Sequence, residues 1–299
     1  MTGSRHRAGL VALIGRPNVG KSTLLNALVG QKVSITSPKP QTTRHRIAGI
    51  LTGPGYQAVF LDTPGLHSRQ RRALNRAMTR AALGSLAEAD LLLFVVDATR
   101  WTADDQSVLE RIKRAAKKTV LVVNMCDRVR PRDRLLPLLE ELAGRHEFEA
   151  IVPLSARTGD NVARLVALLP PLLPEAEPFY PEDQVTDRSE RFLASEVVRE
   201  KLTLALQEEL PYGISVEIER WQEEEGRLLV GAVVWVERVG QRKIVIGEGG
   251  ARLKEVGRAA RLELNELLGR PVRLELWVKV REDWADSDAA LRQFGYDPS

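Results

Sequence analysis

Residues 15–22 form the first group whose types and spacing can do chemistry. Their sequence, GRPNVGKS, fits the pattern GxxxxGKS without a gap, follows an apolar run and precedes a helical pattern. Backbone N–H groups in such a loop bind phosphate oxygens, so we expect Lys21 against the terminal phosphates and Ser22 on Mg²⁺. The predicted phosphate-binding residues are Gly15, Arg16, Pro17, Asn18, Val19, Gly20, Lys21, Ser22 and Thr23.

A second group follows the apolar run at residues 59–61. An aspartate at the end of a strand can bind Mg²⁺, and a backbone N–H close by can contact the terminal phosphate. We therefore assign Asp62 to the metal and Gly65 to the phosphate, although a DTPG sequence on its own is also an ordinary turn. The predicted ligand-binding residues of this group are Asp62, Thr63, Pro64 and Gly65.

The loop between these two groups contains two adjacent threonines, Thr42 and Thr43. A threonine here can complete the Mg²⁺ shell while a γ-phosphate is bound and leave after hydrolysis, which makes a switch. We favour Thr43; the alternative is a polar surface loop. The predicted catalytic residues are Lys21, Thr43 and Gly65, the metal ligands Ser22, Thr43 and Asp62, and the switch residues Gln41, Thr42, Thr43, Arg44 and His45.

The apolar run at residues 120–123 ends in the sequence NMCD. The Asp127 carboxylate can accept two hydrogen bonds from the N1–H and amino group of guanine, and adenine has neither donor there. Asn124 would brace this loop, Met125 would lie in the same site, and Ser155 and Ala156 would offer a backbone N–H to the guanine oxygen. The sequence therefore predicts GTP and GDP as ligands, with Mg²⁺.

No general base follows Gly65. The next residue is Leu66, where a glutamine would orient the attacking water, and His67 is more simply a solvated side chain. Hydrolysis would then depend on positioning and electrostatics, so we expect slow intrinsic turnover.

The elements that must position these residues alternate along the first part of the chain. Apolar runs at 11–14, 59–61, 91–96, 120–123 and 151–154 are separated by helical patterns near 22–28, 74–86, 104–116, 134–142 and 161–169. This alternation predicts a doubly wound α/β domain with a mostly parallel sheet. Residues 170–187 are rich in proline and acid and predict a linker.

The remaining residues predict a smaller α+β domain. Its expected elements are a helix at 191–210, strands at 214–220 and 228–236, a glycine-rich turn at 247–250, a helix at 253–268 and a strand at 272–280. We expect the domain boundaries at 1–173 and 189–299, with 174–188 as the linker. Trp277 is expected in the core of this domain, and Trp284 is expected to pack or to contact a base.

Bulk composition limits the class of protein. The chain has 299 residues, of which 43% are hydrophobic, enough for two cores. A single cysteine, Cys126, excludes a disulfide framework and a cysteine-based zinc site, and no apolar run of membrane-spanning length occurs. We expect a cytoplasmic protein. Residues 1–174 hold 26 Lys and Arg against 14 Asp and Glu, whereas residues 175–299 hold 18 against 26.

A local basic window interrupts this acidic second part. Residues 238–261 contain seven Lys and Arg and only two acids, around a GxxG turn at 247–250. Glycines let such a turn approach a nucleic-acid backbone, and single-stranded RNA then lies along the neighbouring helix and strand. The alternative is an ordinary charged helix face. The predicted RNA-binding residues are Arg242, Lys243, Gly247, Glu248, Gly249, Gly250, Arg252, Lys254 and Arg258.

Several motifs together resemble the bacterial Era GTPase family over nearly the whole chain: GRPNVGKS, PQTTRHRI, DTPGLH, LELWVKV and the ending FGY. The resemblance implies a P-loop G domain followed by a type II KH domain. It further implies binding to the 3′ end of the small-subunit ribosomal RNA during assembly of the small ribosomal subunit, with GTP favouring RNA binding. We also expect a monomer without DNA as partner, and peripheral attachment at the cytoplasmic face of the membrane by analogy with the family.

Two residues depart from the family pattern, which has lysine where Met125 and Glu248 stand. Methionine can cover a flat apolar base, so we expect guanine specificity to be retained with altered affinity. A carboxylate at Glu248 is expected to weaken RNA binding unless it points outward. Related GTPases use an asparagine at the position of Asn18 to bind K⁺, which makes K⁺ a further expected cofactor.

Two other classes of function each fit part of the sequence. A nucleotide-binding RNA scaffold with little GTPase activity would fit the two departures, and a P-loop kinase of a small molecule would fit the phosphate loop. The pair Asn124 and Asp127 argues against the kinase, and the intact Lys21 and Asp62 argue against the inactive scaffold.

Overall fold

The computed structural model describes residues 6–39, 41–65, 72–206 and 213–296, and the chain divides into two compact units. The first unit comprises Met1–Thr36, Thr43–Arg69 and Met78–Asp187. The second comprises Ser37–Thr42, Gln70–Ala77 and Arg188–Ser299. Two short segments from the first part of the chain therefore belong to the C-terminal unit.

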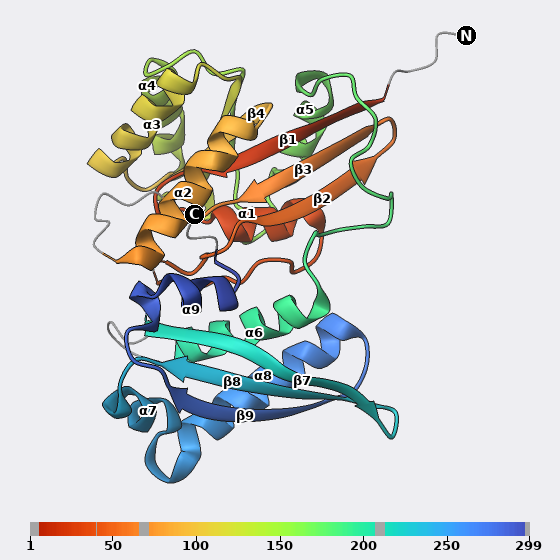
Figure 1. The fold of residues 1–299 in the computed structure, drawn as a ribbon. Coiled ribbons are helices and arrows are strands. Elements are labelled where there is room, and N and C mark those ends of the chain that lie inside the picture. The colour runs from red at the N-terminus through yellow and green to blue at the C-terminus, as the bar shows by residue number, and fades with distance from the viewer. Residues whose placement is uncertain (1–5, 40, 66–71, 207–212, 297–299) are drawn as a thin grey trace. The chain divides into compact units, whose positions relative to one another are not determined.

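The first unit contains a six-stranded sheet in the order β2-β3-β1-β4-β5-β6. Figure 1 shows β2, β3 and β1 side by side in this order. Only the pair β2 and β3 is antiparallel, so the predicted doubly wound, mostly parallel sheet is confirmed. The strands are β1 (Arg7–Ile14), β2 (Ile47–Gly53), β3 (Tyr56–Asp62), β4 (Leu91–Asp97), β5 (Thr119–Asn124) and β6 (Ala150–Pro153). The helices are α1 (Lys21–Val29), α2 (Ala73–Glu88), α3 (Ala103–Ala115), α4 (Leu135–Ala143) and α5 (Val162–Leu168).

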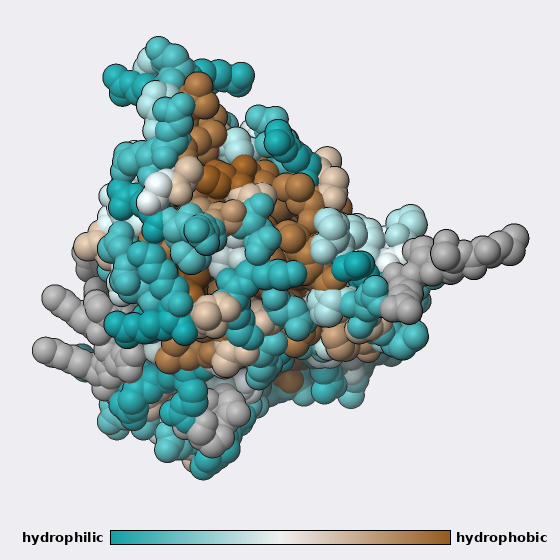
Figure 2. Space-filling model, turned by 90° about the horizontal axis from the view of Figure 1, so that it is seen from above, coloured by the Kyte–Doolittle hydropathy of each residue, from teal (hydrophilic) through white to brown (hydrophobic). Residues whose placement is uncertain are grey.

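Both faces of the central strands are covered, because consecutive residues of β4 and β5 are buried. Leu86 of α2, Leu109 of α3 and Leu142 of α4 pack against Phe94 and its neighbours in one cluster. On the surface seen from above, apolar residues form a patch that hydrophilic residues surround (Figure 2). The near-continuous apolar runs of the sequence are thus strands of a parallel sheet buried on both sides.

The order of the strands decides where the polar residues gather. β1 lies between β3 and β4, so the connection after β1 runs to one side of it and the connection after β3 runs to the other. Ligands bind outside the carboxyl ends of strands at such a switch point. The loop after β1 passes into α1 through Gly20, whose φ of 92° suits glycine alone. A Cβ at Gly20 would also lie 2.4 Å from the Asn124 side-chain nitrogen. The loop after β1 therefore lies close to the carboxyl end of β5, with no room for a larger residue at position 20.

Strand β2 and the ordering of the linker were not predicted. Residues 47–53 form an edge strand that pairs with β3 across the turn at Gly55, a position with a φ of 76°. The proline-rich segment 170–187 lies along the first unit: Gln57 accepts hydrogen bonds from the backbone N–H groups of Phe179 and Tyr180, and Thr186 bridges to Gly49. Side chains far away in sequence order this segment, so its composition alone could not reveal the contacts.

The second unit is the predicted α+β domain. Its three-stranded sheet has the order β7-β8-β9, with β7 and β8 antiparallel and β8 and β9 parallel. The elements are α6 (Glu190–Ala205), β7 (Ile214–Glu224), β8 (Arg227–Val236), α7 (Val239–Ile246), α8 (Ala251–Leu268), β9 (Val272–Val280) and α9 (Asp288–Gln293). Within the described ranges no helix is long and apolar enough to cross a membrane.

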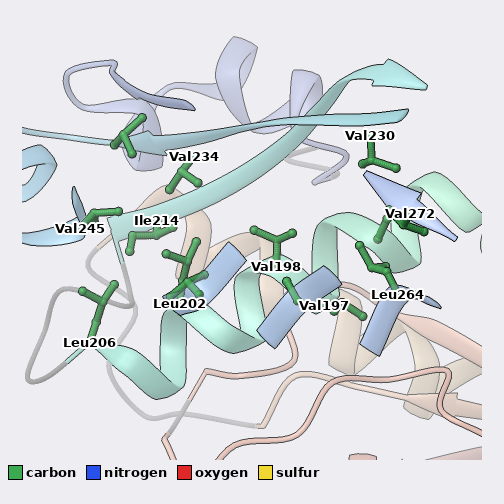
Figure 3. Packing of buried hydrophobic residues seen from close by; sticks show 14 of the residues in the cluster. Val197, Val198, Leu202, Leu206, Ile214, Val230, Val234, Val245, Leu264 and Val272 are labelled. Atoms are coloured by element: carbon green, nitrogen blue, oxygen red, sulfur yellow. The ribbon is translucent and has the colours of Figure 1, made fainter. Parts of the chain in front are cut away.

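One apolar core holds these elements together. Val198 and Leu202 of α6 and Leu264 of α8 face Val230 and Val234 of the sheet (Figure 3). The short helix α7 was not predicted, because its sequence VGQRKIVI has no strong helix signal. Its N-terminus is closed instead by Gln241, whose side chain accepts hydrogen bonds from the backbone N–H groups of Glu237 and Arg238.

The two tryptophans of the C-terminal part have opposite environments. The expectation that Trp277 lies in the core was wrong: it points from β9 to solvent and is 45% exposed. The strand is covered by helices on one face only, so alternate residues are exposed. Trp284 is fully buried, and its indole N–H donates to the Gly213 carbonyl at 3.2 Å, so it packs.

The substitution Leu264→Ala should destabilise the second unit by about 2–5 kcal/mol, because it removes a fully buried side chain and leaves a cavity. Urea unfolding of the full chain, followed by circular dichroism, measures the loss. Leu262→Ala is the matched control on the same helix, since Leu262 is 50% exposed and should change the stability little. Equal effects of the two substitutions would contradict the assignment of the core.

Candidate functional site

Lys21 is the first residue of α1, and its side chain reaches back into the loop between β1 and α1. Its buried ammonium donates to the carbonyl oxygens of Gly15 at 3.0 Å and Arg16 at 2.9 Å. Burial lowers the pKa of Lys21 to about 8, against an opposing effect of the nearby Asp62 carboxylate. The cation is therefore held at the centre of the loop, where an anion would stabilise its charged form.

Arg16 connects this loop to α3. Its Nε donates to Asp105 at 2.9 Å, and its Nη2 lies 3.4 Å from Asp97. Asp105 also accepts a hydrogen bond from the backbone N–H of Thr102 and so closes the N-terminus of α3. All three charged side chains are nearly buried, so this pairing fixes the backbone of the loop at Arg16.

The three predicted metal ligands converge. Ser22 Oγ donates to Asp62 Oδ2 at 2.7 Å and lies 2.7 Å from Thr43 Oγ1. Thr43 Oγ1 is itself 3.3 Å from Asp62 Oδ2, and Ser34 Oγ donates to the same carboxylate oxygen at 2.8 Å. Four oxygens, from α1, from two points of the connection between α1 and β2 and from the end of β3, therefore meet.

This oxygen cluster fits Mg²⁺. Asp62 is fully buried, and its Oδ1 has no hydrogen-bond partner within the described part of the chain. Burial raises the pKa of Asp62, although hydrogen bonds from Ser22, Ser34 and Thr43 and the charge of Lys21 act in the opposite direction. A hard cation bound by oxygen ligands would stabilise this buried carboxylate, and Ser22, Thr43 and Asp62 would hold it.

Asn124 joins three loops at the other end of the site. Its Nδ2 donates to the Val19 carbonyl at 2.8 Å. Its Oδ1 accepts from the backbone N–H groups of Met125 at 2.8 Å and Ala156 at 3.0 Å. The bracing role expected for Asn124 thus has a geometric basis. Because Ala156 donates to Asn124 and Ser155 donates its N–H to Asp160, the contact of these groups with guanine stays a prediction.

The Asp127 carboxylate follows directly in this loop. Ser155 Oγ donates to its Oδ1 at 2.8 Å and Arg157 Nη2 donates to its Oδ2 at 2.5 Å. Partial burial raises the pKa of Asp127, but these two hydrogen bonds outweigh it, and the net pKa is lowered. The carboxylate is therefore ionised and suited to accept two N–H donors of a base.

Met125 lies beside the phosphate loop. Its backbone has a φ of 66°, its Cε lies 3.6 Å from the position of a Cβ on Gly20, and its sulfur accepts from Arg128 at 3.4 Å. The thioether thus occupies the place between the phosphate loop and the base loop. Arg128 brings a positive charge to the position where the family pattern has a lysine.

The other predicted nucleotide-site residues have the following positions. A Cβ at Gly65 would lie 2.8 Å from Pro17 Cγ, so Gly65 contacts the phosphate loop, and Thr63 donates to the Leu13 carbonyl at 3.0 Å. Asn18 has a φ of 63°. Pro64, Arg44 and His45 are buried, Thr23 is half-buried and Gln41 has a φ of 58°. Leu66 and His67 lie outside the described residues.

A basic groove runs along α8 in the second unit. Its volume is about 380 Å³, and its lining consists of Gly250, Leu253, Lys254, Gly257, Arg258, Arg261, Leu274 and Leu276. Of the predicted RNA-binding residues, Gly250, Lys254 and Arg258 line this groove. Apolar side chains on its floor and cations on its rim suit the bases and phosphates of a single strand.

The remaining predicted RNA-binding residues lie at the turn and on α7. Gly247 has a φ of 75°, and a Cβ there would meet Arg252 Cβ at 2.8 Å, so the turn requires glycine. Arg252 donates to the Ile244 carbonyl and thereby closes the turn. Glu248 and Gly249 are exposed, as are Arg242 and Lys243 on α7, so the Glu248 carboxylate points to solvent.

Sequence patterns missed several residues that the fold brings to these sites. Ser34 reaches Asp62 because Asn26 of α1 accepts from the backbone N–H groups of Val33 and Ser34 at 3.0 Å. Arg157, in the loop after β6, donates a hydrogen bond to Asp127, in the loop after β5. Arg261 lies one turn beyond Arg258, so its helical spacing was the one available signal.

The substitution Asp62→Asn should weaken Mg²⁺-dependent nucleotide binding by on the order of 100-fold, because it removes the one buried charge of the metal set. Titration of Mg²⁺ against a fluorescent GTP analogue measures this effect. Ser34→Ala is the matched control, because it leaves the charge and removes a single hydrogen bond. Unchanged Mg²⁺ dependence in Asp62→Asn would place the metal elsewhere.

The substitution Asp127→Asn should lower the affinity for GDP by on the order of 100-fold or more, because two hydrogen bonds to a charged acceptor are lost. Xanthine has an oxygen where guanine has its amino group, so the affinity for xanthosine diphosphate should rise. Competitive binding with the two nucleotides tests the change of preference. Asp133→Asn, at an exposed carboxylate in the following turn, should leave both affinities unaltered.

Comparison with known families identifies both units. Residues 10–125 match the family described as 50S ribosome-binding GTPase, and residues 209–285 match the KH domain. The GTPase Era of Stenotrophomonas maltophilia is 54% identical over 292 residues, which cover 98% of each chain. The GTPase Era of Xanthomonas oryzae pv. oryzae is 54% identical over 297 residues, which cover 99% of each chain.

Two solved structures of Era proteins have the same fold. A crystal structure of Era in complex with MgGDPNP and nucleotides 1506–1542 of 16S ribosomal RNA has a TM-score of 0.94 and 44% identity, covering 98% of this chain and 99% of that chain. An Aquifex aeolicus Era variant bound to GDP.AlF4⁻ also has a TM-score of 0.94 and 44% identity, covering 97% and 99%. With more than half of its residues identical over nearly the full length of its relatives, this chain belongs to the Era family of GTPases.

Proposed function

We propose that this GTPase is a switch that binds the 3′ end of small-subunit ribosomal RNA and acts in assembly of the small ribosomal subunit. The observation that supports the switch best is the position of Thr43. Its hydroxyl lies 2.7 Å from Ser22 and 3.3 Å from Asp62, in a segment that also leads to the C-terminal unit. A γ-phosphate with Mg²⁺ would favour this position of Thr43, and hydrolysis would release it.

In this proposal the nucleotide-site residues divide into phosphate, metal and base contacts. Lys21 and the backbone of residues 15–22 would bind the phosphates, the oxygen cluster around Asp62 would hold Mg²⁺, and Asp127 would recognise guanine. Mg²⁺ would neutralise charge on the phosphates. Lys21 would stabilise the negative charge that develops while the γ-phosphoryl group is transferred to water. Turnover without a partner would be slow, as the sequence at Leu66 predicts.

The RNA would lie in the groove along α8. Its bases would contact the apolar floor at Leu253, Leu274 and Leu276, while Lys254 and Arg258 would neutralise phosphates. The relative solved with nucleotides 1506–1542 of 16S ribosomal RNA supports this class of ligand. We further propose residues 1–173 as the GTPase domain, 174–188 as the linker and 189–299 as the RNA-binding domain.

Three further expectations belong to the proposal. K⁺ at Asn18 would assist hydrolysis, which predicts faster turnover in K⁺ than in Na⁺ at equal ionic strength. Monomeric state and peripheral attachment at the cytoplasmic face of the membrane stay predictions, with small-angle scattering and vesicle co-sedimentation as their measurements.

The combined substitution of Lys254→Ala and Arg258→Ala should weaken binding of a single-stranded RNA with the ribosomal 3′ sequence by on the order of tenfold or more. The slope of log K against log salt should fall by about 2, because two phosphate contacts are lost. Fluorescence anisotropy with labelled RNA, with a GTP analogue and with GDP, measures both effects. Arg292→Ala is the control, since Arg292 is exposed on α9 and does not line the groove.

Tighter binding of this RNA with the GTP analogue than with GDP is the expected result for the unmodified protein. Equal affinities in the two states would contradict a nucleotide-gated RNA switch. An unchanged salt slope in the double variant would place the RNA outside the groove along α8.

A further inference from the structure

The segment Ser37–Thr42 belongs to the same compact unit as Arg188–Ser299. It forms a small loop, in which the Thr42 hydroxyl lies 2.7 Å from the Ser37 hydroxyl and donates to the Lys39 carbonyl at 2.7 Å. Arg199 of α6 and Leu206, which directly follows that helix, hold this loop at two points. Lys39 donates to the Leu206 carbonyl, and Arg199 Nη2 donates to the Thr42 carbonyl at 2.5 Å.

Arg199 is fixed before it reaches Thr42. Its Nε donates to Glu196 Oε1 at 2.7 Å and its Nη2 to Glu196 Oε2 at 2.6 Å, one turn earlier on α6. The two side chains are only 3% and 7% exposed. A two-point pair between a guanidinium and a carboxylate fixes orientation as well as charge, so Nη2 is aimed at the Thr42 carbonyl without freedom to turn away.

The Thr42 carbonyl and Thr43 belong to the same peptide link. The carbonyl carbon of Thr42 is bonded to the backbone nitrogen of Thr43. The Thr43 hydroxyl lies 2.7 Å from Ser22 Oγ. Because the peptide unit is planar, a rotation that frees this carbonyl also moves the Thr43 backbone. The contact to Arg199 and the place of Thr43 in the oxygen cluster are therefore mechanically linked.

Arg72 and Ala73, at the start of α2, have an equivalent connection. Arg72 Nη1 donates to both oxygens of Glu237, at 3.2 and 2.9 Å, and the backbone N–H of Ala73 donates to Asp286 at 2.9 Å. Glu237 is nearly buried. Both segments next to the γ-phosphate motifs thus form hydrogen bonds within the C-terminal unit, but only the Arg199 contact is adjacent to a metal ligand.

We propose that Arg199 is a positioning residue that couples the nucleotide site to the RNA-binding part of the chain. Its guanidinium, held by Glu196, keeps the Thr42 carbonyl in the orientation that places Thr43 in the metal site. Binding of Mg²⁺ with a triphosphate and the Arg199 contact then stabilise each other, because linkage between two sites is reciprocal. This inference rests on the proposed switch function and names the contact through which that switch acts.

The substitution Arg199→Lys tests the contact with the least disturbance. Lysine keeps the charge that pairs with Glu196, but it lacks the forked group that reaches both Glu196 and Thr42. The affinity for a GTP analogue with Mg²⁺ should fall by about tenfold, within the usual range of coupling between sites. The affinity for GDP should change by less than about twofold, because GDP makes no contact that depends on Thr43.

RNA binding gives a second readout, which would stay unchanged if Arg199 only stabilised the fold. The ratio of RNA affinities with GTP analogue and with GDP should shrink toward one in Arg199→Lys, while the affinity with GDP stays the same. A second variant, Arg199→Met with Glu196→Gln, removes both buried charges at similar volume and should show the same loss. Arg191→Lys, at an exposed arginine on the same helix, is the control.

The possible outcomes distinguish failure of the proposed Arg199 coupling from failure of the proposed switch function. If the unmodified protein distinguishes the two nucleotides in RNA binding and Arg199→Lys does so equally well, the inference is overturned. An equal loss of every affinity also overturns it, because that result reports folding and not coupling. If the unmodified protein shows no nucleotide dependence, the proposed switch fails, and the inference then stands or falls on the change in discrimination between the GTP analogue and GDP.

Discussion

The nucleotide site depends on one buried carboxylate, that of Asp62 at the end of β3. A buried carboxylate needs compensation, and here hydroxyl groups of Ser22, Ser34 and Thr43 supply it at 2.7–3.3 Å. Ser22 belongs to α1, whereas Ser34 and Thr43 both belong to the connection between α1 and β2, so satisfying one charge fixes two points of that connection against the helix. The same oxygens are the ligands that Mg²⁺ prefers, so stability without metal and binding of metal make use of one arrangement.

The parallel sheet explains why that carboxylate lies among the right neighbours. Its central strands are buried on both faces, and polar residues can appear only where strands end. The order β2-β3-β1-β4-β5-β6 places the ends of β1, β3, β5 and β6 along one edge. Asn124 then joins the phosphate loop at Val19 to the base loop through hydrogen bonds of 2.8–3.0 Å. The predicted phosphate-binding loop and the predicted base-binding loop are thereby held together.

The second unit combines a rigid core with short segments from elsewhere in the chain. Its helices and sheet share one apolar cluster, while Ser37–Thr42 and Gln70–Ala77 join it by polar contacts. Polar contacts of this kind can exchange partners at little cost, whereas a close-packed core cannot. The hydrogen bonds of Arg199 and Arg72 are contacts of this polar kind.

The sequence by itself determined the doubly wound α/β domain, the α+β domain and the family, because motif spacing and apolar runs are local properties. It also predicted one nucleotide site that contains Lys21, Ser22, Thr43, Asp62 and Asp127. Only the tertiary structure decided that Ser34 and Arg157 join that site, that β2 and α7 exist, and that Trp277 is exposed. These features depend on contacts between residues far apart in the chain. Arg199 and Thr42 are 157 positions apart in the sequence, so no local pattern predicts their contact.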